Sequence, residues 1–193
     1  MSKKLTRSQL IKRLVISAIF IAVSIALNEL TPIKFPFGGS VTFFSMVPLA
    51  LIGWQYGLSW GMVCGAAMGV LDMVIGGLGN FAYVAGIGAY LILIFADYFV
   101  AFGVMGLSGM FKGKLHNATL ELALGAGVAC VLRFVCHFIS GVTIWADYAG
   151  GFASVWLYSL TYNGGYMLPE LIITVIGCVI ISRIKPIMRK LAD

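Results

Sequence analysis

The sequence predicts an all-α integral membrane protein in which six transmembrane helices form one bundle. Three observations predict this fold class: long uninterrupted apolar runs, few charged residues, and cations gathered at the ends of those runs. Hydrophobic residues make up 61% of the chain and charged residues only 10%, whereas soluble domains carry about 25% charged residues. A surface this poor in charge indicates that the surrounding solvent is a lipid bilayer.

Six apolar segments approach the length of about 20 helical residues that crossing the hydrocarbon core requires. No small-residue cleavage site follows the first segment, so we expect it to be retained as a span. A glycine-rich run at residues 76–80 is expected to end the third span, and the whole chain, residues 1–193, to be a single transmembrane domain. The expected spans are residues 10–29, 41–56, 60–75, 83–111, 118–140 and 158–184.

The distribution of Lys and Arg predicts the orientation of the bundle. One side holds eleven of these residues, the other holds only Lys34, and Arg133 lies within the fifth span. Because cations gather on the cytoplasmic side, both termini are expected to be cytoplasmic and the loops at 31–40, 76–82 and 141–157 external. The eleven cations are Lys3, Lys4, Arg7, Lys12, Arg13, Lys112, Lys114, Arg183, Lys185, Arg189 and Lys190.

Composition and absent motifs exclude several function classes. Cations beside span ends account for the net charge of +6, so no nucleic-acid partner is expected. The four cysteines lie in apolar segments without a C-x-x-C pair, which predicts buried thiols rather than a zinc site or disulfides. The chain lacks G-x-x-x-x-G-K-[ST], H-E-x-x-H and G-x-S-x-G, so we expect no enzyme, catalytic residue, metal or cofactor.

Two ladders of small residues recur at every fourth position, a spacing that lets helix backbones approach closely in lipid. The glycine ladder is expected to pack inside the bundle. The alanine ladder leaves two alternatives open, either internal packing or contact with a partner subunit. The glycine ladder is Gly53, Gly57, Gly61, Gly65 and Gly69, and the alanine ladder is Ala18, Ala22 and Ala26.

Polar residues inside the expected spans predict a binding site, because such residues are costly in lipid and usually face an interior cavity or a partner. The span directions bring Asp97, His137 and Asn163 toward one pocket in the outer half of the bundle. Arg133 lies one turn deeper than His137, about 6 Å along the same helix face. An acid beside aromatic rings suits a flat, cationic, heteroaromatic ligand. The aromatic residues expected nearby are Trp145, Tyr148, Trp156, Tyr158, Tyr162 and Tyr166.

Each polar or aromatic residue of the expected spans and loops could also have a purely structural role instead of binding a ligand. Asp97 and Arg133 are equally consistent with an ion pair, and His137 with a hydrogen-bonded core side chain. Asp72 and Glu170 are more typical of span ends or of packing. An interfacial aromatic belt would account for Trp145, Tyr148 and Trp156.

Several motifs together carry a resemblance to a known family. G-G-S-V leads into M-V-P within residues 38–48, D-Y-F-V-A-F occupies 97–102, and L-R-F, His and S-G-V follow within 132–142. The most specific run is V-W-L-Y-S-L-T-Y-N at 155–163, followed by Y-M-L-P at 166–169. Over nearly its whole length the chain resembles the thiamine-specific S components (ThiT or YuaJ type) of energy-coupling factor (ECF) transporters.

The resemblance implies a multi-pass protein of the bacterial cell membrane that captures thiamine at the outer face for ATP-driven uptake. It also implies partners, namely a transmembrane coupling subunit of the EcfT type and two cytoplasmic ATPases. Ala18 and Ala22 would dock on the coupling subunit, with Ala26 continuing that face. Tyr148 is the alternative to Trp145 as the loop aromatic residue of the implied site. Arg133 is also predicted to bind the substrate, because it lies one turn below His137. The implied thiamine-binding residues are Asp97, Tyr98, His137, Trp145, Tyr158 and Asn163.

Two other functions stay open at this point. The first is an S component for another vitamin, such as riboflavin or a pyridine derivative, against which the run at 158–163 argues. The second is a small membrane enzyme that acts on lipid headgroups through Asp97, Arg133 and His137, although the chain carries no recognisable catalytic motif.

Overall fold

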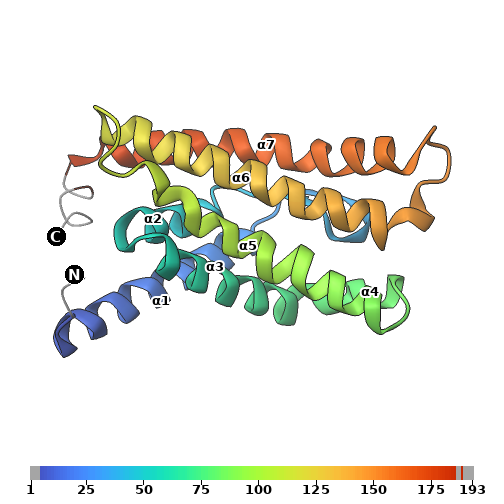
Figure 1. Cartoon of the computed structure of the whole chain (residues 1–193), viewed down its shortest axis with the longest axis horizontal. Coiled ribbons are helices and arrows are strands. Elements are labelled where there is room, and N and C mark those ends of the chain that lie inside the picture. Colours follow the sequence, from blue (N-terminus) through green and yellow to red (C-terminus); the bar gives the residue numbers. More distant parts are fainter. Residues whose placement is uncertain (1–4, 186–187, 189–193) are drawn as a thin grey trace.

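The computed structural model describes residues 5–185 and 188, and these form a helical bundle with one small β-hairpin (Figure 1). The hairpin pairs β1 (Ile33–Lys34) with β2 (Ser40–Val41) in antiparallel register, around the short turn η1 (Pro36–Gly38). The α-helices are α1 (Arg7–Glu29), α2 (Val47–Tyr56), α3 (Leu58–Asp72), α4 (Ile87–Ile92), α5 (Ala101–Gly103), α6 (Ala118–Thr143) and α7 (Val155–Arg183).

Tighter and wider helical turns extend several of these helices into longer rods. The π-helical η2 (Met73–Gly77) and the 3-10 helix η3 (Leu78–Tyr83) continue α3. The π-helical η4 (Leu93–Val100) joins α4 to α5, and the 3-10 helix η5 (Val104–Phe111) follows α5. Among the described residues, five rods are consequently long and apolar enough to cross a membrane: Arg7–Glu29, Leu58–Tyr83, Ile87–Phe111, Ala118–Thr143 and Val155–Arg183.

The second expected span is the one that the structure corrects most. Helix α2 has 10 residues, about 15 Å of helix against about 30 Å of hydrocarbon. The prediction of a helix over residues 41–46 is therefore wrong. Val41 belongs to the hairpin, and Phe44 has a φ of 61°, a left-handed conformation that no α-helix accommodates. The helix begins just before Pro48, which is favoured in a first turn.

The third expected span does not end in a loop at residues 76–82. Instead the chain stays helical to Tyr83, changing from α to π to 3-10 geometry. Gly77 allows this because its backbone lies against the ring of Tyr98, where a Cβ would collide with the hydroxyl. The Tyr98 hydroxyl also donates a hydrogen bond to the Gly77 carbonyl at 3.3 Å.

The glycine ladder packs inside the bundle, as expected. A Cβ at Gly53, Gly61, Gly65 or Gly69 would collide with backbone atoms of the rod Ile87–Phe111 or of α2. The fifth member, Gly57, instead forms the turn between α2 and α3 with a φ of +90°, a conformation that glycine adopts without strain. Close backbone contact of this kind replaces the hydrophobic driving force that is missing in lipid.

Helix α1 divides cleanly into two faces. Ser17 and Ser24 are buried against the bundle, whereas the three residues of the alanine ladder are all exposed. Figure 1 shows the first turn of α1 and the last turn of α7 at the same end of the molecule. Four of the cations used to predict orientation lie outside the described residues: Lys3, Lys4, Arg189 and Lys190.

Candidate functional site

A cavity of about 240 Å³ opens among α1, the hairpin, η2, η4, α6 and α7. It lies away from the end at which α1 begins and α7 ends. The walls combine carboxylates, amides, aromatic rings and two cations, a mixture typical of a site for a small polar ligand. All seven residues singled out from the sequence as binding residues line it: Asp97, Tyr98, Arg133, His137, Trp145, Tyr158 and Asn163.

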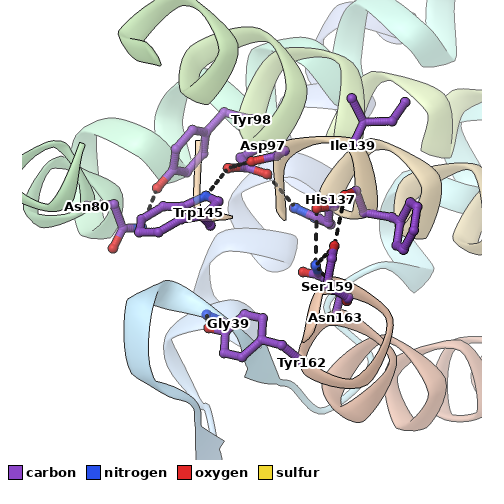
Figure 2. A network of polar contacts seen from close by, with 12 residues as sticks. Gly39, Asn80, Asp97, Tyr98, His137, Ile139, Trp145, Ser159, Tyr162 and Asn163 are labelled. Atoms are coloured by element: carbon purple, nitrogen blue, oxygen red, sulfur yellow. Dashed lines mark hydrogen bonds and ion pairs between the residues drawn. The ribbon is translucent and has the colours of Figure 1, made fainter. Parts of the chain in front are cut away.

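Asp97, on the π-helical η4, is the centre of the polar network in this cavity (Figure 2). Its Oδ1 lies 3.0 Å from Nδ1 of His137, and the two side chains are only 14% and 11% exposed. Its Oδ2 accepts hydrogen bonds from the Ser140 hydroxyl at 2.6 Å and from Nε1 of Trp145 at 3.2 Å. Donors from two turns of α6 and from the following loop thus fix the orientation of this carboxylate.

Arg133 does not form the ion pair with Asp97 that the sequence left open. Its guanidinium carbon instead lies 4.3 Å from the ring centroid of Phe102. Within residues 5–185 and 188, the only carboxylate with a basic partner inside 4 Å is Asp97, and that partner is His137. Arg133 therefore lines the cavity wall with a charge that no described side chain neutralises directly.

Trp145, rather than its rival Tyr148, contacts the carboxylate. Trp145 is 7% exposed, and the ring of Phe37 from the hairpin lies 5.9 Å from it. Tyr148 forms an outer layer, with its ring 4.4 Å from Phe37 and its hydroxyl donating to the Tyr83 carbonyl at 2.9 Å. Only Trp156, 64% exposed, fits the interfacial belt.

Helix α7 supplies one wall as a series of aromatic and amide side chains. The rings of Tyr158 and Tyr162 stack with centroids 5.8 Å apart. Nδ2 of Asn163 donates to the His137 carbonyl at 3.1 Å, while its Oδ1 accepts from the Tyr166 hydroxyl at 2.8 Å. Asn163 thus joins α6 to α7, and its Oδ1, which can accept a second hydrogen bond, remains an acceptor for a ligand.

Three buried polar atoms of the wall lack a hydrogen-bond partner in the described part of the chain. They are Nε of Arg133, Nε2 of His137 and the hydroxyl of Tyr158. Buried polar groups are nearly always paired, so unpaired ones lining a cavity are the groups a ligand can satisfy. The alternative that His137 is a fully satisfied core histidine is therefore wrong for one of its two ring nitrogens.

The sequence reasoning missed part of the wall. Asp72 accepts a hydrogen bond from Nδ2 of Asn28 at 2.5 Å and faces the same cavity, so it is more than a span-end residue. Asn80 donates to the Tyr98 hydroxyl at 2.9 Å. Ser140 could have been found, since it lies one turn after His137 on α6. Phe37 carried no such signal, because its position depends on the fold of the hairpin.

No metal site competes for these residues in the part of the chain that the structure describes, where no three His, Cys, Asp or Glu side chains converge. The polar groups are instead spread around the cavity as single donors and acceptors. This arrangement suits an organic ligand with several different edges better than it suits an ion.

Comparisons with known proteins show the family and the fold of the chain. The family described as Thiamine transporter protein (Thia_YuaJ) matches residues 14–190. The chain is 30% identical to thiamine transporter ThiT of Bacillus subtilis (strain 168) over 197 residues, covering 96% of this chain and 98% of that protein. It is 26% identical to thiamine transporter ThiT of Lacticaseibacillus paracasei over 152 residues, covering 74% and 73%. The structure of ThiT from Listeria monocytogenes shares the fold, with a TM-score of 0.72 at 24% identity, over 94% of this chain and 98% of that one.

Proposed function

Because the chain belongs to the thiamine transporter family, we propose that it is the thiamine-binding S component of an ECF-type transporter. In this role it captures thiamine at the external face of a bacterial cell membrane and releases it inward when partner ATPases hydrolyse ATP. The family consists of transport proteins rather than enzymes, and this removes the lipid-headgroup enzyme from consideration.

The observation that carries the proposal is the carboxylate of Asp97 held among aromatic rings in a membrane-embedded cavity. Thiamine contains a permanently positive thiazolium ring. A fixed negative charge attracts that ring more strongly in a site of low dielectric constant than in water. The faces of Trp145 and Tyr158 add cation–π attraction for the same ring.

The remaining wall groups match the other edges of thiamine. The free Nε2 of His137 and the hydroxyl of Tyr158 can pair with ring nitrogens and the amino group of the pyrimidine. Arg133 and Lys34 also line the cavity and are the cations available to an oxygen at the far end of the ligand. Riboflavin, which is larger and uncharged, would leave Asp97 without a counter-charge.

Isothermal titration of the purified protein with thiamine, riboflavin and pyridoxal tests this function. We expect saturable one-to-one binding of thiamine and no measurable binding of the other two vitamins at the same protein concentration. Equal binding of riboflavin or pyridoxal would instead favour an S component for another vitamin. Absence of thiamine binding by a folded protein would overturn the proposal.

The transport partners are proposed from α1 and from what the sequence lacks. No phosphate-binding loop motif is present, so the energy for uptake comes from a partner or an ion gradient, and the family resemblance favours an EcfT-type subunit with two ATPases. Ala18, Ala22 and Ala26 lie exposed along one face of α1, where a partner helix can approach closely. The excess of cations beside one set of span ends supports cytoplasmic termini.

Replacing Ala22 by leucine is expected to lower thiamine uptake at least about fivefold while leaving thiamine affinity unchanged, because the added side chain separates the docking helices. Uptake is measured in vesicles that contain the complete transporter, and affinity by titration. Ala67→Leu is the matched control, because Ala67 is an exposed alanine on a different helix, α3. Equal uptake by the two variants would place the docking face elsewhere.

A further inference from the structure

Residues 33–46, the covering segment, contribute Lys34, Phe35 and residues 37–40 to the cavity wall, and the second half of the segment runs along α7 in the same direction as that helix. The Gly39 N–H donates to the Tyr162 hydroxyl at 3.2 Å, and the ring of Phe35 lies 5.9 Å from that of Tyr166. Farther along, Phe44 fits against Gly177, where a Cβ would collide with its ring. The segment thus has contacts near the mouth of the cavity and deeper in the bundle.

Glu170 binds this covering segment between those two sets of contacts. Its Oε2 accepts the backbone N–H of Thr42 at 2.8 Å, and its Oε1 accepts the Thr42 hydroxyl at 2.7 Å and the Ser45 hydroxyl at 3.3 Å. Glu170 and Thr42 are each 2% exposed, and Ser45 is fully buried. A single carboxylate therefore receives three donors from one short stretch of irregular backbone.

Burying a carboxylate costs free energy, which hydrogen bonds or an opposite charge must offset. Within residues 5–185 and 188, Glu170 lies within 4 Å of no basic group, so hydrogen bonds alone offset its desolvation. Irregular backbone at membrane depth has no water to satisfy its N–H groups, and an unpaired one costs several kcal/mol in hydrocarbon. Glu170 supplies the acceptor that helical geometry would otherwise provide at Thr42.

We propose that Glu170 is a positioning residue for ligand capture: its hydrogen bonds to Thr42 and Ser45 hold the covering segment over the cavity. The same segment carries Lys34, Phe35 and residues 37–40 on the cavity wall, including Phe37 against Trp145. Glu170 does not line the cavity, so it acts on the ligand only through the backbone that it fixes. The effect on thiamine rests on the function proposed above.

A hydrogen bond from Ser24 connects the covering segment, which Glu170 holds on α7, to a second helix, α1. The hydroxyl of Ser24, on the buried face of α1, donates to the Ser45 carbonyl. Ser45 is thereby held on one side by α7 and on the other by α1, which carries the exposed alanines on its opposite face. The covering segment, α7 and the proposed docking helix α1 therefore meet at this residue.

Amide hydrogen exchange of the ligand-free protein tests the anchor without reference to thiamine. Glu170→Ala is expected to accelerate exchange in residues 33–46 at least about tenfold, because removing the acceptor leaves the Thr42 N–H unpaired. Exchange in residues 146–153, an external loop that Glu170 does not contact, should stay unchanged. Equal protection of residues 33–46 in the variant and the wild type would overturn the proposal.

Glu121→Ala is the matched control for general destabilisation. Glu121 is also a buried carboxylate, but it lies in the first turn of α6, accepts from the backbone N–H of Leu115 and has no hydrogen bond to residues 33–46. We expect this variant to leave exchange in residues 33–46 as in the wild type. If both variants loosen that segment equally, Glu170 only contributes to stability and the proposed positioning role is wrong.

Two milder variants keep the proposal testable if Glu170→Ala does not fold. Glu170→Gln retains an oxygen for the Thr42 N–H, so it should preserve most of the protection. Thr42→Val removes the hydroxyl and keeps the volume, so it should accelerate exchange in residues 33–46 by a smaller factor than Glu170→Ala. Exchange in residues 33–46 that is as fast in Glu170→Gln as in Glu170→Ala would contradict the proposed hydrogen bonds. Wild-type protection of these residues in Thr42→Val would contradict them as well.

Thiamine kinetics then separate positioning from binding. Glu170→Ala should raise the dissociation rate of thiamine at least about threefold, because the segment over the ligand opens more often. Faster exchange without any change in dissociation would overturn the positioning role while leaving the proposed function intact. Absence of thiamine binding in the wild type would instead remove the proposed function, and the exchange result would still stand as a test of the anchor.

Discussion

Replacing Asp97 by asparagine is expected to weaken thiamine binding at least about tenfold, which corresponds to about 1.4 kcal/mol. Asparagine keeps the size of the side chain but removes the negative charge that we propose faces the thiazolium ring. It also presents an amide N–H₂ to a shell that consists largely of donors, from Ser140, Trp145 and His137. Titration of the purified variant with thiamine gives the affinity directly.

Asp147→Asn is the control for long-range charge. Asp147 lies exposed in the short helix η6 (Ala146–Tyr148), close in sequence to Trp145 but not on the cavity wall. The variant removes the same charge from the loop that follows α6, and we expect its affinity for thiamine to match that of the wild type. Unchanged affinity in the Asp97 variant would instead assign the counter-charge to Asp72, the other aspartate of the cavity.

Replacing Trp145 by alanine is expected to produce the larger loss, about 30-fold or about 2 kcal/mol, as for a buried aromatic residue at the centre of an interface. The change removes a ring face from the cavity, a hydrogen bond to Asp97 and the packing surface of Phe37. Titration with thiamine measures the affinity, and stopped-flow fluorescence shows whether association or dissociation changes.

Two further tryptophan variants identify the cause of that loss. Trp145→Phe keeps an aromatic face without the N–H donor, so it should recover much of the affinity if stacking dominates. Trp156→Ala removes the exposed tryptophan at the start of α7 and should bind thiamine as the wild type does. Equal losses at Trp145 and Trp156 would mean that the effect comes from membrane anchoring rather than from the cavity.

The sequence was sufficient to predict the helices that carry the polar residues of the site. Once the direction of each span is assigned, the depths of Asp97, His137 and Asn163 follow from the rise per residue, and these three side chains do meet. The choice of Trp145 over Tyr148 rested on resemblance, and the structure gives the physical difference: only the indole of Trp145 reaches the carboxylate.

What the sequence could not predict depends on contacts between distant residues. Thr42 and Glu170 are 128 positions apart, and their bond gives the Thr42 N–H an acceptor where residues 41–46 are not helical. Nothing in the apolar pattern of that stretch distinguishes an extended segment from a helix. The continuation of the third rod through Gly77 is similar, because the ring of Tyr98 fills the space beside this glycine.

Helix α7 carries one wall of the cavity and also the anchor of the segment above it. Tyr158, Tyr162 and Tyr166 face the cavity from the same 29-residue rod that holds Glu170. When a thinner or thicker bilayer tilts such a rod, we expect the tyrosine wall and the Glu170 contacts of the covering segment to move together. Asp97 lies on a different rod, Ile87–Phe111, so we expect lipid thickness to alter the distance from the tyrosines of α7 to Asp97 across the cavity.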